Sequence, residues 1–134
     1  MTMKFSVGDS AEITRTIEQA DIDAFADVTG DHNPVHVDEE FAKTTRFRRR
    51  IAHGMLTASL ISAVLANHLP GEGSVYLGQT LQFLAPVFPG DEITARVTVL
   101  EIREDKPILK LETVCVNQRE ETVLRGEATV LAAD

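Results

Sequence analysis

Residues 53–71 (HGMLTASLISAVLANHLPG) restrict the fold most, because their apolar side chains point to nearly every side of a helix. The apolar positions are Met55, Leu56, Ala58, Leu60, Ile61, Ala63, Val64, Leu65 and Ala66. A helix that is apolar all round, yet shorter than the roughly 18 residues of a membrane span, is typical of a protein core. The segment therefore predicts a central helix that another layer must cover.

The second half of the chain predicts that covering layer. Its four β-rich segments are 74–87, 91–104, 106–118 and 121–133, separated by the turn-forming stretches FPGD, EDKP and QREE. Within 91–104 the side chains of Ile93, Ala95, Val97, Val99 and Glu101 alternate onto one face. Strands that follow helices predict an α+β protein with an antiparallel sheet. A curved antiparallel sheet wrapped around one apolar helix is the hot-dog fold.

The N-terminal third predicts one strand and two helical segments. Residues 11–17 alternate as a strand, and the helical period then begins. The signals for the helices are a Thr16–Gln19 capping box, an apolar stripe of Ile22, Phe25 and Ala26, a stop at Gly30, and a short turn over 37–45 with Phe41 and Ala42 inward. This part of the chain is therefore expected to bring a loop after Gly30 toward the core.

Composition excludes several classes of function. The 134 residues predict a single domain (1–134) without a membrane span or leader, which favours a cytoplasmic protein. A net charge of −8 and a pI near 4.9 argue against nucleic acid as a partner. The single cysteine, Cys115, excludes an intrachain disulfide and fits a reducing compartment.

The segment DHNPVH (31–36) concentrates groups that bind and transfer protons. Because Pro34 restricts its neighbour Asn33, we expect a rigid turn on which Asp31 and His36 converge. The alternative is that the side chain of Asp31 or Asn33 only caps local backbone amides, a role that fits Asn33 better than Asp31. Calcium is excluded because an EF-hand needs glycine where His36 stands and glutamate twelve positions into the loop. The remaining chemical interpretation is an Asp/His pair that activates water.

Zinc and serine-hydrolase sites do not fit the sequence either. The Cys and His spacing matches no zinc site, since Cys115 lies in a predicted strand, and there is no nucleophile elbow. We expect His32 and His68 to be solvated.

His53 and Gly54 stand at the start of the predicted central helix, where backbone amides are free. The missing side chain of Gly54 would let a carbonyl approach its N–H, which indicates an oxyanion site. The alternative is that Gly54 only permits close packing, and His53 is expected to support the site rather than act as a second base. Four arginines within 46–50 (RFRRR) form either a solvated loop or a docking site for a phosphorylated ligand.

The stretches FADVTGDHNPVHVDEEFA, RIAHGMLTASLIS and LGQTLQFLAPVFPGDEITA together resemble the MaoC-like (R)-specific enoyl-CoA hydratases, a branch of the hot-dog superfamily with the hydratase-2 motif. The resemblance covers essentially the whole chain and is strongest to the small hydratases associated with polyhydroxyalkanoate synthesis. It implies reversible syn addition of water to a trans-2-enoyl-CoA, giving an (R)-3-hydroxyacyl-CoA. Arg50 departs from the family, many of whose members carry proline before IAHG.

The resemblance also implies roles for individual residues. Asp31 and His36 fall on the catalytic pair, the amide of Gly54 receives the thioester oxygen, Asn33 holds the turn, and Ser62 lies near the catalytic carboxylate. No metal or redox cofactor is expected, and the partners are the coenzyme A thioester and a second copy in a homodimer. Leu65 is a candidate for the end of an acyl tunnel, the alternative being a plain core leucine.

Three other functions remain open on the sequence. An acyl-carrier-protein dehydratase would use the same chemistry on another carrier. An acyl-CoA thioesterase of the same fold would release a free thiol and would not need the Asp31/His36 pair. A non-catalytic acyl-CoA-binding module would need neither residue.

Overall fold

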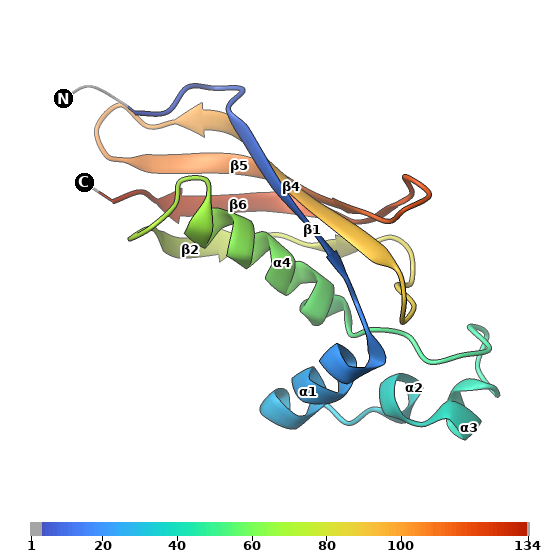
Figure 1. Cartoon of the computed structure of the whole chain (residues 1–134). Helices are drawn as coiled ribbons and strands as arrows, with labels where there is room; N and C mark the ends of the chain where they lie inside the picture. The colour runs from blue at the N-terminus through green and yellow to red at the C-terminus, as the bar shows by residue number, and fades with distance from the viewer. Residues whose placement is uncertain (1–3, 134) are drawn as a thin grey trace.

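A six-stranded antiparallel sheet forms the larger layer of the structure, a computed structural model that describes residues 4–133 (Figure 1). The strands run in the order β1-β4-β5-β6-β2, and the short β3 pairs with β6. Their bounds are β1 (Ser10–Thr16), β2 (Val75–Gln79), β3 (Gln82–Phe83), β4 (Glu92–Ile102), β5 (Ile108–Val116) and β6 (Thr122–Leu131). One edge of the sheet is β1, and the other is formed by β2 and β3, which both pair with β6.

Helix α4 (Gly54–Asn67) runs along one face of this sheet, which confirms the hot-dog fold (Figure 1). Ile61 and Val64 are completely buried there, and Leu60 and Leu65 are nearly so. They pack against inward-facing strand residues such as Val97 in a single apolar core. The buried apolar side chains are the main stabilising contribution to this layer.

One face of α4 is open, although apolar residues occur on nearly every side of this helix. Met55 is 55% exposed, and Ser59, Ser62 and Ala66 are exposed on the same stripe. These positions are spaced by three or four residues and so lie on one side of the helix. The sheet of a single chain covers only the opposite side.

The alternation predicted for the second half holds over most of β4. Ile93, Ala95, Val97 and Val99 are all at most 1% exposed, as predicted. Glu101 is exposed, because the pairing with β5 shifts register between Val99 and Glu101. The prediction of a single strand over 74–87 was also wrong. This segment contains two shorter strands, β2 and β3, and no strand continues after Phe83 until β4 begins.

Helix α1 (Gln19–Thr29) follows β1 and ends, as predicted, at Gly30 in the left-handed conformation (φ 81°). The prediction of a Thr16–Gln19 capping box was wrong, since Thr16 still belongs to β1 and pairs with Glu92. The helix is instead capped at Glu18, whose N–H donates to the Asp21 carboxylate at 2.9 Å. That hydrogen bond is the main reason that the pKa of Asp21 is lowered.

Two single-turn helices, α2 (Pro34–Val37) and α3 (Glu39–Ala42), connect α1 to the chain that leads into α4. Ala42 is fully buried, as predicted, but Phe41 is 45% exposed. A helix of one turn presents too narrow a face to bury both neighbours. The expectation that Phe41 points inward was therefore wrong.

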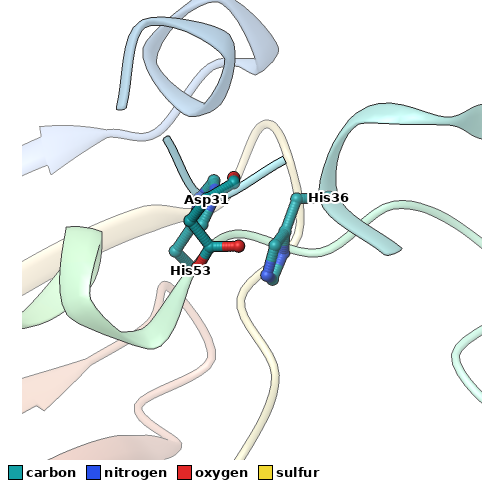
Figure 2. Close-up of side chains that lie close together, drawn as sticks. All are labelled: Asp31, His36 and His53. Atoms are coloured by element: carbon teal, nitrogen blue, oxygen red, sulfur yellow. The ribbon is translucent and has the colours of Figure 1, made fainter. Parts of the chain in front are cut away.

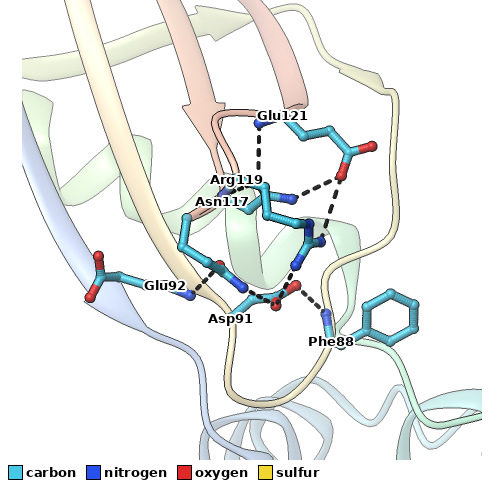
Figure 3. Close-up of polar contacts among 7 residues, drawn as sticks. Phe88, Asp91, Glu92, Asn117, Arg119 and Glu121 are labelled. Carbon is cyan, nitrogen blue, oxygen red and sulfur yellow. Dashed lines mark hydrogen bonds and ion pairs between the residues drawn. The ribbon is translucent and has the colours of Figure 1, made fainter.

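A polar network joins the turn before β4 to the turn between β5 and β6 (Figure 3). The carboxylate of Asp91, 5% exposed, accepts hydrogen bonds from the Phe88 N–H at 3.0 Å and from Gln118 at 2.9 Å. Asn117 closes the second turn by accepting two backbone N–H groups at 3.0 Å each. The network fixes Phe88, and the guanidinium of Arg49 lies 3.7 Å from the centroid of its ring.

Within residues 4–133, no helix has both the length and the apolar character needed to cross a membrane.

Candidate active site

The segment after Gly30 is a capped helical turn, whereas the sequence predicted a simple bend. Pro34 occupies the first position of α2, where its missing N–H costs nothing. The Asn33 side chain caps this turn by accepting the Val35 N–H at 3.2 Å, and the Asp31 carboxylate accepts the Asn33 N–H at 3.3 Å. Both side chains thus have the local capping role that the sequence left open. Asp31 is nevertheless exposed, so its carboxylate is accessible to a ligand.

His36 is held by a backbone contact on the other side of the site. Its Nδ1 lies 2.8 Å from the carbonyl oxygen of Ile51. A carbonyl oxygen only accepts, so the neutral ring carries its hydrogen on Nδ1 and leaves the lone pair on Nε2 free. Partial burial lowers the pKa of His36, and His53 lowers it further, against the opposing effects of the Ile51 hydrogen bond and Asp31. At neutral pH the ring is therefore mostly uncharged, with the lone pair of Nε2 available to accept a hydrogen.

Three segments bring Asp31, His36 and His53 together (Figure 2). Asp31 follows α1, His36 lies in α2, and His53 immediately precedes α4. Their ligand atoms lie within 4.8 Å of one another, a distance at which a metal ion has to be considered. The two imidazoles are stacked, however, with centroids 3.9 Å apart and planes inclined by 29°. In-plane lone pairs of nearly parallel rings do not converge on one ion, so the geometry fits a metal centre poorly, and the absence of a metal stays a prediction.

Gly54 opens α4 beside a pocket of about 600 Å³. Within residues 4–133, its backbone N–H has no hydrogen-bond acceptor. A Cβ at Gly54 would lie 2.5 Å from Cε1 of Phe83, so glycine is needed for close packing as well. The two interpretations of Gly54 are thus compatible, because the same missing side chain admits the Phe83 ring and leaves the amide accessible.

The pocket beside Gly54 is lined by His36 on a mostly apolar surface. Its polar lining includes His36 and Arg46, and its apolar lining includes Phe83, Leu84 and Val87. A concave apolar site with few convergent polar groups is typical of small-molecule binding. It can hold an acyl thioester with the carbonyl at the start of α4.

The structure places the other predicted residues away from this pocket. Ser62 lies on the open face of α4 and lines a second pocket with Tyr76 and Gln79. Leu65 is 2% exposed in the core, the position of a plain core leucine. The catalytic support expected from Ser62 and the tunnel role of Leu65 stay predictions.

Among the other histidines, His32 and His68 are exposed, as expected. Cys115 is buried, and burial raises its pKa to about 12, which makes the thiol unreactive.

Sequence reasoning missed two contributors to the site. The carbonyl of Ile51 fixes the tautomer of His36, and the ring of Phe83 covers Gly54. Neither residue has a polar side chain or a motif that would mark it. The only signal was the glycine at position 54, which indicated that something approaches the backbone closely.

Comparison with known proteins identifies the family. The family model described as MaoC like domain matches residues 6–122. The chain belongs to the MaoC-like family. A relative from Aeromonas caviae, an (R)-specific enoyl-CoA hydratase, is 50% identical over 124 residues, which is 92% of each chain. The solved structure of the (R)-hydratase from A. caviae involved in PHA biosynthesis superposes with a TM-score of 0.96 at 47% identity, covering 98% of this chain and all of that one.

The MaoC-like relatives also include enzymes named for another carrier. A mitochondrial 3-hydroxyacyl-[acyl-carrier-protein] dehydratase from Arabidopsis thaliana is 41% identical over 128 residues, which is 93% of this chain and 76% of that protein.

The lowered pKa of His36 predicts the pH dependence of this MaoC-like site. We expect activity to require neutral His36, so kcat/KM should fall as the pH drops through the pKa of this ring. Because that pKa is below 6.5, the acid limb should have its midpoint below pH 6.5. The measurement is kcat/KM from pH 4.5 to 9 at constant ionic strength, with protein stability checked at each pH. A midpoint above 6.5 would contradict the assignment.

Proposed function

We propose that this chain is a single-domain (R)-specific enoyl-CoA hydratase, a hydro-lyase that adds water reversibly to trans-2-enoyl-CoA. The observation that carries the proposal is that the carboxylate of Asp31 lies beside His36, which lines one pocket together with Gly54 and its unpaired N–H. The relatives named (R)-specific enoyl-CoA hydratase support the reaction and its stereochemistry. Fatty-acid intermediates and polyhydroxyalkanoate synthesis are the proposed metabolic setting.

Each residue has a role in the proposed reaction. Asp31 and His36 hold one water molecule by accepting its two hydrogens, and one of them removes a proton as the oxygen attacks C3. A proton is returned from the pair to C2, so the pair ends in its starting protonation state and the two additions occur on one face. The Gly54 N–H donates to the thioester oxygen, where negative charge develops as the C2–C3 double bond is lost. Asn33 keeps Asp31 in place by capping α2.

Arg46 is the arginine we propose for binding the phosphates of coenzyme A. Of the arginines in 46–50, Arg49 stacks on Phe88 and Arg50 forms an ion pair with Glu39 at 3.0 Å. Arg46 lines the pocket, and within residues 4–133 it forms no ion pair. This leaves its guanidinium available for an anionic ligand.

Substituting Arg46→Ala should raise KM for crotonyl-CoA about fivefold and leave kcat within twofold, since an exposed ionic contact contributes roughly 1 kcal/mol. Steady-state kinetics at low ionic strength, where screening is weak, is the measurement. Arg125→Ala, a matched change on the exposed side of β6, serves as the control. An unchanged KM would remove Arg46 from the binding site.

We also propose that the protein acts as a homodimer in the cytoplasm. Exposed apolar side chains cluster near the open face of α4 and the edge strand β2: Met55, Val75, Tyr76 and Leu77. An apolar face beside an unpaired strand edge favours a second copy of the chain as its cover. Sedimentation equilibrium should give twice the chain mass of 14.7 kDa, and a mass equal to one chain would contradict the proposal.

The direct test is to mix purified protein with crotonyl-CoA and follow the loss of the conjugated enoyl absorbance beside a free-thiol assay. Loss of absorbance without thiol, with (R)-3-hydroxybutyryl-CoA as the product in chiral analysis, supports the hydratase. Release of thiol indicates a thioesterase instead. If crotonyl-CoA and longer enoyl-CoA substrates are inert, the same assay with crotonyl-acyl-carrier protein tests the dehydratase. Inertness there would leave a non-catalytic binding module.

A further inference from the structure

His53 occupies the N-cap position of α4 without capping the helix. An N-cap side chain usually accepts a hydrogen bond from one of the first helical amides. The side chain of His53 makes no such bond; its Nε2 lies 3.0 Å from the backbone carbonyl oxygen of Asp31. His53 is therefore joined to the segment that carries the carboxylate and not to the amides of its own helix.

The hydrogen bond to Asp31 determines which nitrogen of His53 carries the hydrogen. Because the carbonyl oxygen can only accept, the hydrogen is on Nε2, and Nδ1 of the neutral ring has a lone pair. This Nδ1 is buried, in a residue 2% exposed, and within residues 4–133 it has no hydrogen-bond partner. A buried acceptor without a donor destabilises the protein, a cost that a phenylalanine in this position would avoid. The imidazole must therefore provide something that a purely apolar ring does not.

The ring of His53 also contacts two aromatic neighbours. The ring of Phe25 in α1 is one of them, with centroids 4.8 Å apart and an inclination of 52°. His36 is stacked on it at 3.9 Å. One side chain thus contacts both members of the water-binding pair, Asp31 through its main chain and His36 through its ring face (Figure 2).

We propose that His53 is a positioning residue that sets the distance and orientation between Asp31 and His36 through its Nε2–H bond and its stacked ring. The inference rests on the proposed hydration reaction. It assigns His53 no contact with the substrate, since His53 is only 2% exposed and its ring contacts Phe25 and His36. Small displacements of two reacting groups lower the rate strongly, so a substitution of His53 should lower kcat.

The positioning role of His53 should be detectable in the pH dependence of kcat/KM, because few titratable groups surround His36. The titratable groups against its ring are His53, at the start of α4, and Asp31, after α1; Arg46 lines the same pocket. Helix α1 presents uncharged Gln19, whose Nε2 donates to the His36 carbonyl at 3.0 Å. Burial is the largest cause of the lowered pKa of His36, so removing the His53 ring stacked on it should move the acid limb of kcat/KM to higher pH.

Three substitutions of His53 separate its hydrogen bond to the Asp31 carbonyl from its stacking on the His36 ring. His53→Ala removes both and should lower kcat about 10- to 100-fold while KM for crotonyl-CoA stays within twofold. His53→Gln keeps an amide donor for the Asp31 carbonyl, and His53→Phe keeps a ring against His36, so each should recover part of the lost kcat. The control is His68→Ala, an exposed histidine at the opposite end of α4, which should change neither kcat nor the pH midpoint.

The kinetics are normalised to the folded fraction of each variant. A His53→Ala variant with kcat within twofold of the parent, or a loss of kcat with an unmoved pH midpoint, overturns the proposal. Nitrogen-15 NMR of the histidine rings in the unsubstituted protein gives a test that needs neither activity nor folded variants. It should show hydrogen on Nε2 of His53 and on Nδ1 of His36, and the opposite tautomer of His53 overturns the proposal even if hydratase activity is present. Absence of activity in the parent protein would instead contradict the proposed function.

Discussion

Asp31→Asn should lower kcat/KM for crotonyl-CoA hydration about 1,000-fold, the largest effect on activity that we expect from a single substitution. An asparagine oxygen can still accept the Asn33 N–H, which Asp31 now accepts at 3.3 Å, so the turn should remain folded. What is lost is the carboxylate that binds the reacting water and exchanges its proton. The measurement is the initial rate of absorbance loss, made beside circular dichroism and a thermal melt that show the variant is folded.

Asp27→Asn is the matched control for this change. Asp27 is an exposed acid of α1, and its carboxylate lies 4.0 Å from His32, outside the pocket. Its substitution should leave kcat/KM within twofold. A folded Asp31→Asn variant that keeps a tenth of the parent rate would show that the carboxylate is not part of the reaction.

Combining Asp31→Asn with His36→Ala tests whether the two groups act on one water. If they do, the double variant should be only slightly slower than the slower single variant, because either change already removes the shared step. Losses that multiply would indicate two independent contributions.

Local signals in the sequence predicted much of the fold and the members of the site. The Gly30 stop, the apolar face of β4 and the grouping of Asp31 with His36 depend on spacings of a few residues, which a sequence displays directly. The errors came where tertiary pairing overrides such spacings. Thr16 looked like a helix cap, but its pairing with Glu92 keeps it in β1.

The details of the site depend on contacts between distant parts of the chain. The hydrogen on Nδ1 of His36 is fixed by the carbonyl of Ile51, which is 15 residues away in the sequence. The accessibility of the Gly54 amide depends on the position of the Phe83 ring, which is set by strand β3. The open face of α4 could not be predicted either, because Met55 and Ala66 are as apolar as the residues that face the sheet. Hydrophobicity alone does not distinguish a face covered by the same chain from one that a second copy would cover.

Gly126 in β6 is the position where a single methyl group should be most damaging to stability. A Cβ there would lie 1.8 Å from the carbonyl oxygen of Thr80 and 2.6 Å from its carbonyl carbon, both backbone atoms. Thr80 joins β2 to β3 and is bound to Glu127 twice, by its N–H at 2.9 Å and by its hydroxyl oxygen, which accepts at 3.0 Å. The clash therefore cannot be relieved without breaking this connection.

Gly126→Ala should lower the free energy of unfolding by about 3 kcal/mol and the melting temperature by roughly 10 °C. Urea denaturation and a thermal melt are the measurements, with Arg125→Ala, the exposed neighbour on the same strand, as the control expected to change stability by less than about 0.5 kcal/mol. Since Thr80 leads directly into β3, the displacement should also move Phe83 away from Gly54 and lower kcat/KM in the fraction that folds. A variant as stable as the parent would mean that the segment between β2 and β3 can move without loss of stability. In that case the sheet would not hold Phe83 over the start of α4.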